Sequence, residues 1–177
     1  MRKILESTFV SLDGVISNPQ DYSPTYWDDE HFGYSASLME GADAQLLGRV
    51  TYEGFADAWS QRTGEMADHF NNMKKYVASR TLTETTWNAE LLQGDAVEAV
   101  RRLKESEGGN LIKFGTGEFS KALLDAKLVD EYHFWIFPVI AGSGDRLFDG
   151  LPMTHLDLLG TTTFKSGIVV HKLAPKA

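Results

Sequence analysis

The order of apolar and polar positions predicts strands and helices that alternate through the first 140 residues. Short runs of β-branched and aromatic residues favour strands, whereas apolar residues three or four positions apart favour helices. Strands are expected at residues 3–12, 44–47, 75–78, 111–114 and 130–140. Helices are expected at residues 27–40, 51–59, 66–72, 95–106 (with an Asp95–Glu98 capping box) and 118–126.

The pattern changes after residue 140. A polar loop at residues 141–150 precedes two further strands, near residues 155–164 and 168–173, which a glycine-containing turn joins. Alternating strands and helices build a largely parallel sheet that is covered on both faces, and a terminal hairpin adds antiparallel strands. We therefore expect an α/β fold in a single domain that spans residues 1–177.

Composition excludes several classes of function. The net charge of −8 argues against nucleic-acid binding, which needs a basic face. The absence of cysteine excludes disulfides, thiolate zinc sites and cysteine nucleophiles, and it fits a cytoplasmic protein. No apolar run approaches the roughly 20 residues of a membrane span, and the five histidines lack metal-ligand spacing, so neither a membrane nor a metal site is expected.

A glycine turn follows the predicted strand at residues 111–114. Gly115, Thr116 and Gly117 lie between that strand and a helix, where backbone amides can face an anion and the Thr116 hydroxyl can add a hydrogen bond. The dinucleotide fingerprint G-x-G-x-x-G would place a third glycine at the position of Ser120, so a standard Rossmann domain is not predicted. The turn is either a different kind of phosphate site or a tight connection without a ligand.

Two other segments combine arginine with hydroxyl groups after a strand. Arg49 and Thr51 begin a helix directly after Gly48, which again favours an anion. Residues 79–81, a serine–arginine–threonine triplet, suit a phosphate monoester such as the 2′-phosphate of NADPH. Taken singly, the first segment can be an ordinary helix cap and the second a solvated loop. If the strands are parallel, these segments gather at one edge of the sheet, where ligands of α/β folds bind.

Five motifs together carry a resemblance to a known family. They are "SLDGVIS", "LLGRVTYEGF", "VASRTL", "FGTGEF" and "FPVIAGSGDRLF", in this order and across nearly the whole chain. The sequence resembles the dihydrofolate-reductase-like superfamily, and most of all the reductase domain at the C-terminus of the bifunctional riboflavin-biosynthesis deaminase/reductase. This resemblance implies a three-layer sandwich, an NADPH cofactor, a small-molecule substrate and a homodimer.

The resemblance also implies where the cofactor binds. The G-R-x-T segment contacts its phosphates, the hydroxyl-rich loop holds the 2′-phosphate, the glycine turn cradles the pyrophosphate, and the S-x-D-G segment lies beside nicotinamide and substrate. The implied cofactor residues are Gly14, Gly48, Arg49, Val50, Thr51, Ser79, Arg80, Thr81, Gly115, Thr116, Gly117, Glu118 and Phe119. The implied substrate residues are Ser11, Val15, Trp27, Pro138, Gly142, Gly144 and Leu147.

The chain departs from the pattern in two ways. It lacks the cysteines of the deaminase zinc site, so only the reductase chemistry is implied. Dihydrofolate reductases hold the pterin with a single acid on the first helix, whereas three acids stand here, Asp28, Asp29 and Glu30, and their alternative role is to complement the helix dipole. We expect Asp13, Asp28 or Asp29 to orient the substrate or supply its proton.

The expected function is therefore an NADPH-dependent oxidoreductase. It would transfer hydride to a small heteroaromatic substrate, pterin-like or aminouracil-like, in the manner of the riboflavin-pathway reductases. A phosphorylated riboside is less favoured, because Arg146 and Arg62 are the arginines left over for a second anion site. The alternatives are a non-catalytic, dimeric nucleotide-binding protein of the same fold, and a flavin bound at the same edge.

Overall fold

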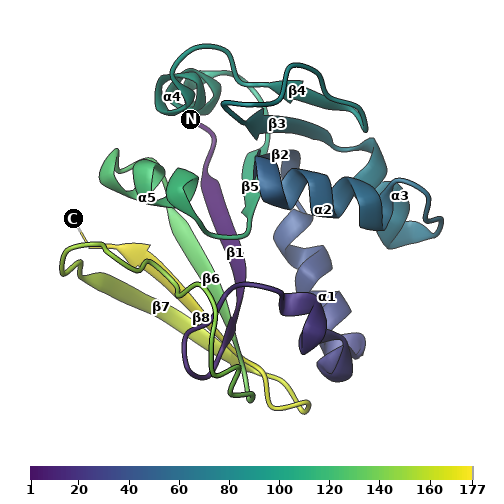
Figure 1. Ribbon diagram of the computed structural model, residues 1–177, viewed down its shortest axis with the longest axis vertical. Helices are drawn as coiled ribbons and strands as arrows, with labels where there is room; N and C mark the ends of the chain where they lie inside the picture. Colours follow the sequence, from purple (N-terminus) through teal and green to yellow (C-terminus); the bar gives the residue numbers. More distant parts are fainter. Residues whose placement is uncertain (177) are drawn as a thin grey trace.

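Eight strands form one sheet in the order β4-β3-β2-β5-β1-β6-β8-β7 (Figure 1). The computed structural model describes residues 1–176. The strands are β1 (Ile4–Ser11), β2 (Ala42–Gly48), β3 (Lys74–Ala78), β4 (Ala89–Leu91), β5 (Asn110–Phe114), β6 (Glu131–Phe137), β7 (Leu156–Thr163) and β8 (Val169–Pro175). Every pairing among β1 to β6 is parallel, and β8 runs antiparallel to both β6 and β7. The predicted mostly parallel sheet with a C-terminal antiparallel hairpin is confirmed.

Helices cover both faces of this sheet (Figure 1). On one face lie α1 (Asp29–Met39), α2 (Arg49–Trp59) and α3 (Glu65–Asn72), and on the other lie α4 (Ala96–Glu105) and α5 (Glu118–Asp125). Successive strand residues point alternately into the two hydrophobic cores, one on each face of the sheet. Leu111 packs with the α4 and α5 side chains, whereas its neighbour Ile112 packs with those of α1 and α3.

The differences from the predicted elements are small and have local causes. Strand β4 was not predicted, because three residues at the edge of a sheet carry no periodic pattern. Helix α1 begins at Asp29 instead of residue 27, since the Asp28 side chain accepts a hydrogen bond of 2.8 Å from the backbone N–H of His31 and so caps the helix. Asp95 caps α4 in the same way at 3.0 Å, but Glu98 pairs with Arg101 instead of closing the predicted capping box. The loop before α1 also contains two short 3₁₀ helices, Pro19–Asp21 and Ser23–Tyr26.

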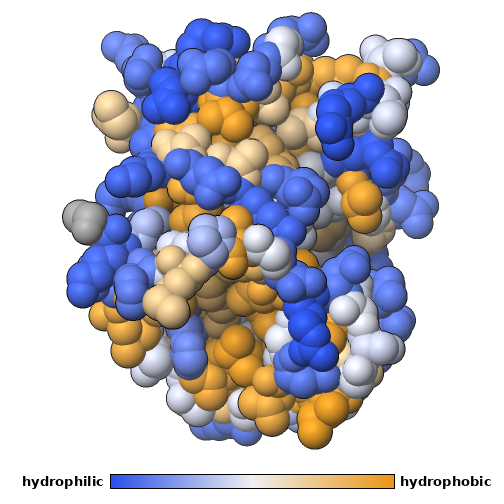
Figure 2. All heavy atoms as spheres, turned by 60° about the vertical axis from the view of Figure 1, so that its left-hand side comes forward, coloured by the Kyte–Doolittle hydropathy of each residue, from blue (hydrophilic) through white to orange (hydrophobic). Residues whose placement is uncertain are grey.

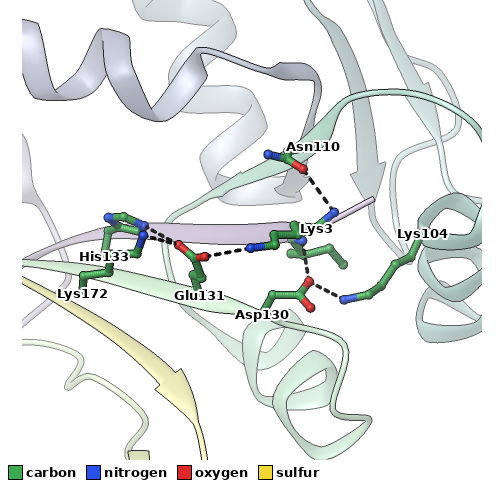
Figure 3. Close-up of polar contacts among 8 residues, drawn as sticks. Lys3, Lys104, Asn110, Asp130, Glu131, His133 and Lys172 are labelled. Atoms are coloured by element: carbon green, nitrogen blue, oxygen red, sulfur yellow. Dashed lines mark hydrogen bonds and ion pairs between the residues drawn. The ribbon is translucent and has the colours of Figure 1, made fainter. Parts of the chain in front are cut away.

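Ion pairs fasten the amino edge of the sheet (Figure 3). Glu131 at the start of β6 pairs with Lys3 at 3.3 Å and with Lys172 of β8 at 2.9 Å. Its neighbour Asp130 accepts a hydrogen bond of 2.8 Å from the first N–H of β1 and pairs with Lys104 of α4. The opposite charges of these groups neutralise one another, and their contacts connect β1, β6, β8 and α4. The charged groups at the amino edge therefore have a structural role, because they hold these strands and α4 in contact.

The surface shows apolar atoms between hydrophilic side chains on the side that carries α5 and the β7–β8 hairpin (Figure 2). Leu158 and Leu159 of the edge strand β7 are 62% and 51% exposed. Within residues 1–176, no helix combines the length and the apolar character that crossing a membrane requires.

Candidate functional site

The carboxyl edge of the sheet collects the predicted cofactor segments. Because β3, β2, β5 and β1 are parallel neighbours, the segments that follow them emerge side by side. Gly48 at the end of β2 is in register with Ala78 at the end of β3, so the G-R-x-T segment adjoins the hydroxyl-rich loop. Three segments that lie far apart in sequence thus share one edge.

Gly115 and Thr51 make the closest approach between two of these segments. Gly115 has a φ of +72°, and a Cβ built on it would lie 2.7 Å from the Thr51 hydroxyl oxygen. A side chain at Gly115 would therefore collide with the start of α2, in addition to straining the backbone. The glycine turn and the G-R-x-T segment meet here, with glycine required at the point of contact.

The first turn of α5 presents unpaired backbone amides. The first backbone–backbone hydrogen bond of this helix runs from the Lys121 N–H to the Gly117 carbonyl. Within residues 1–176, the N–H groups of Thr116, Glu118 and Phe119 donate to no protein acceptor. Such amides at a helix N-terminus are the groups that bind phosphate.

The Thr116 hydroxyl, in contrast, faces the protein. It donates to a carboxylate oxygen of Glu6 at 2.9 Å and hydrogen-bonds with the Thr8 hydroxyl at 2.7 Å. The sequence suggested this hydroxyl as a ligand contact, whereas the structure uses it to anchor the turn to β1. What Thr116 offers to a ligand is its backbone N–H.

Ser120 supports the glycine turn from below. It occupies the place of the third glycine in the Rossmann fingerprint, and its hydroxyl oxygen accepts from the Gly117 N–H at 3.3 Å and from the Lys113 ammonium at 2.6 Å. Lys113 also donates to the Gly115 carbonyl at 2.5 Å and lies 3.6 Å from the fully buried Glu6. Sequence reasoning missed this buried group, although a lysine and a glutamate inside apolar strands were a signal for it.

The two remaining cofactor segments offer arginine side chains to solvent. Arg49 is about half exposed and pairs with Glu53 one helical turn later, at 2.8 Å. Arg80 is exposed, and within residues 1–176 its guanidinium has no hydrogen-bond or ion-pair partner. The Ser79 hydroxyl oxygen accepts from the Thr81 N–H at 3.2 Å and so closes the loop around Arg80.

Asp13 fastens two predicted substrate segments together. Its carboxylate accepts from the Ser11 hydroxyl at 2.6 Å and from the N–H groups of Ala141 and Gly142 at 2.9 and 2.8 Å. These hydrogen bonds, the one from Ser11 above all, hold the pKa of Asp13 well below its usual range. The carboxyl group is therefore ionised at neutral pH, which suits orienting a substrate better than donating a proton.

The loop after β6 packs closely on the residues that follow β1. Val15 forms an isolated bridge with Arg146, and the Leu147 N–H donates to the Gly14 carbonyl at 2.9 Å. A Cβ at Gly144 would lie 2.6 Å from Val15. The predicted substrate residues Ser11, Val15, Gly142, Gly144 and Leu147 thus come together, and Pro138 leads from β6 into the same loop.

The acids near the start of α1 have different surroundings. Asp28 caps the helix, and Glu30 accepts from the Lys165 N–H of the β7–β8 turn at 2.7 Å. Asp29 is exposed, and within the described residues its carboxylate makes no hydrogen bond or ion pair. Trp27 is 38% exposed beside the buried His31.

Two further side chains near these segments, the buried His31 and the half-buried Tyr22, have shifted pKa values. His31 packs between Phe9 and Trp135, and burial lowers its pKa to about 4, so its imidazole is neutral at pH 7. Burial and the charge of Asp13 raise the pKa of Tyr22 to about 12. Neither residue stands in one of the five motifs.

Solved structures with the same fold come from several bacteria. A candidate riboflavin biosynthesis protein from Shewanella sp. PV-4 has a TM-score of 0.78 and 21% identity, over 99% of both chains. A pyrimidine reductase-like protein from Corynebacterium diphtheriae has a TM-score of 0.69 and 13% identity, over 99% of this chain and 92% of the other. A deaminase/5-amino-6-(5-phosphoribosylamino)uracil reductase from Thermotoga maritima has a TM-score of 0.68 and 17% identity, but this chain matches 57% of that chain.

Sequence comparison identifies relatives of similar length and the protein family to which the chain belongs. The chain is 29% identical to the uncharacterized protein YyaP of Bacillus subtilis, over 95% of this chain and 92% of that protein. It is 27% identical to the uncharacterized protein YwjB of the same organism, over 96% and 97%. The model of the RibD C-terminal domain family matches residues 2–170. The chain belongs to the RibD C-terminal domain family, whose reductase-like fold it shares.

Proposed function

We propose that this protein is an NADPH-dependent reductase that transfers hydride to a small heteroaromatic substrate, pterin-like or aminouracil-like. The observation that carries the proposal is the meeting of Thr51 with Gly115 at the carboxyl edge, next to the unpaired amides of α5. A dinucleotide has separated phosphates, and three adjacent segments offer a separate place for each of them. Membership of a reductase-like family adds to this support.

Each segment has its own task in the proposed complex. The amides of Thr116, Glu118 and Phe119 would hold the pyrophosphate, and Arg49 would contact the phosphates from the start of α2. Arg80 would hold the 2′-phosphate that distinguishes NADPH from NADH. When bound, NADPH supplies the hydride, and the residues of this chain orient it and exclude water.

The substrate would lie between the Asp13 segment and the start of α1. The ionised Asp13 can fix the loop of residues 138–150 and accept a hydrogen bond from substrate, while the exposed Asp29 remains available for proton transfer. Arg146 donates to the Asp13 carbonyl, and Arg62 lies over the Trp59 ring, 5.1 Å from its centre. Because both arginines are engaged, an unphosphorylated substrate is favoured.

The test is a titration of the purified protein with NADPH, followed by the quenching of tryptophan fluorescence. Saturable binding below about 1 mM, the upper end of the usual range of enzyme KM values, is expected. A panel of pterins and aminouracils then tests turnover through the loss of NADPH absorbance at 340 nm. Absence of saturable binding at sub-millimolar NADPH contradicts the proposal.

The second candidate is a nucleotide-binding protein without catalysis. It is favoured by the engagement of the acids, because Asp13, Asp28 and Glu30 all serve structural hydrogen bonds. Tight NADPH binding with no turnover across the panel would select it. A yellow colour of the purified protein would instead indicate a bound flavin.

We further propose that the protein is a homodimer that pairs through β7. This strand is the sheet's edge and exposes Leu158 and Leu159, which are unfavourable in contact with water. Sedimentation equilibrium is expected to give twice the chain mass, and Leu159→Glu is expected to give a folded monomer. Gln61→Glu, which adds the same charge at an exposed position beyond the C-terminal end of α2, should leave the dimer intact. A monomeric wild type contradicts the proposal.

A further inference from the structure

We propose that Lys113, together with Ser120, is a positioning residue that turns the glycine loop so that its amides face the cofactor pyrophosphate. The inference rests on the proposed NADPH function and adds to it two side chains that would not touch the ligand. It also gives a role to Lys113, a lysine of β5 whose side chain is buried in the protein.

Lys113 directs its ammonium group at the underside of the turn. It donates hydrogen bonds to the Gly115 carbonyl at 2.5 Å and the Ser120 hydroxyl at 2.6 Å, and it forms an ion pair with the Glu6 carboxylate at 3.6 Å. The Lys113 and Glu6 side chains are 2% and 0% exposed. The Lys113 ammonium therefore contacts only buried groups of the protein and cannot reach a ligand at the carboxyl edge.

The hydrogen bond to Gly115 fixes the direction of the next amide. In a planar trans peptide, the carbonyl of one residue and the N–H of the next point to opposite sides. No peptide bond between described residues is cis. Since the Gly115 carbonyl points inward at Lys113, the Thr116 N–H points outward, and it has no protein acceptor.

Ser120 and Glu6 complete the support. The Ser120 hydroxyl oxygen holds the Gly117 N–H at 3.3 Å, and Glu6 accepts from the Thr116 hydroxyl at 2.9 Å. Gly115, Thr116 and Gly117 thus each form a hydrogen bond with a buried polar side chain. A glycine turn without such support could rotate its peptide planes freely, because glycine allows many backbone conformations. The amides would then have to be ordered when the ligand binds, which lowers affinity.

The experiment compares two ligands with the full-length protein. NADPH needs the glycine turn, whereas adenosine 2′-monophosphate lacks the pyrophosphate and needs only the loop of Arg80. Lys113→Met and Ser120→Ala are expected to raise the Kd for NADPH about 10- to 100-fold, the effect of losing one hydrogen bond from a misdirected turn amide to the charged pyrophosphate. The Kd for adenosine 2′-monophosphate, measured by NMR titration, should change less than about threefold, which is within about 0.7 kcal/mol.

Lys104→Met is the matched control. Lys104 is also a buried lysine with an acidic partner, Asp130, but it belongs to the amino edge (Figure 3). Its loss should lower the melting temperature without changing the ratio of the two Kd values. Ser120→Ala removes no charge, so it carries the test if Lys113→Met fails to fold.

A second readout needs no cofactor. In the ligand-free protein, the amide resonances of Thr116 and Gly117 should shift or broaden in Lys113→Met and Ser120→Ala, and stay in place in Lys104→Met. If the wild type binds NADPH but the Kd ratio is the same in all variants, the positioning role is overturned and the proposed function stands. If the wild type binds no NADPH, the proposed function fails, and unchanged amide resonances would overturn the positioning role as well.

Discussion

Arg80→Ala is expected to weaken NADPH binding about 10- to 100-fold, which corresponds to the loss of one hydrogen bond to a charged group. Arg80 is exposed and unpaired within the described residues, so its removal breaks no protein contact that would affect folding. NADH lacks the 2′-phosphate, and its Kd should change less than about twofold, a difference of about 0.4 kcal/mol. The two values come from fluorescence titrations of the same preparation with each cofactor.

Arg49→Ala is the matched control for this prediction. Arg49 begins α2 and is proposed to contact phosphates that both cofactors carry, so its loss should weaken NADPH and NADH by the same factor. Its pairing with Glu53 is exposed and contributes at most about 1 kcal/mol to stability. Equal weakening of both cofactors by Arg80→Ala would remove Arg80 from the 2′-phosphate site.

The order of elements could be predicted because each has a clear local signal. Strand β5 is a short apolar run bounded by glycines, and α4 follows a capping aspartate. Helix boundaries moved by one or two residues where a side chain decides the cap, as Asp28 does for α1. Strand β4 has three residues, and it exists because Asn88 and its neighbours pair with β3, which is a contact that no local pattern encodes.

The sequence predicted which segments form the candidate site, but not the direction in which their side chains point. Glycine, arginine and hydroxyl residues after strands indicate the carboxyl edge, and the parallel sheet brings them together. Whether a side chain faces the ligand or the core depends on tertiary packing. Thr116 turns inward to Glu6, and Asp13 is occupied by the backbone of a loop that begins more than 120 residues later. Sequence alone identified these residues, but the direction of their side chains follows from the folded structure.

Gly115→Ala tests the contact on which the proposed function rests. The new methyl group would lie 2.7 Å from the Thr51 hydroxyl oxygen, at a residue whose φ of +72° disfavours any side chain. The backbone strain alone costs about 1–3 kcal/mol, and a loss of about 2 kcal/mol lowers the melting temperature of a chain of this size by about 4–8 °C. The displaced turn should also bind NADPH at least about 10-fold more weakly, a loss of about 1.4 kcal/mol.

Gly117→Ala separates this contact from a general effect of alanine in the turn. Gly117 has an extended φ of 179°, and a Cβ there would meet no protein atom within 4 Å. Its replacement should change the melting temperature by less than about 2 °C, since a substitution without strain or collision stays within about 0.5 kcal/mol.

Thr51→Ala completes the test as a double-mutant cycle with Gly115→Ala, measured by thermal unfolding. Removing the Thr51 hydroxyl takes away the colliding atom but leaves the strained φ of Gly115. Gly115→Ala should therefore be less destabilising in the Thr51→Ala background, by about 0.5–3 kcal/mol, the range for residues in contact. Additive effects would mean that the start of α2 and the glycine turn do not touch in solution, and a shared cradle for the phosphates would then have no physical basis.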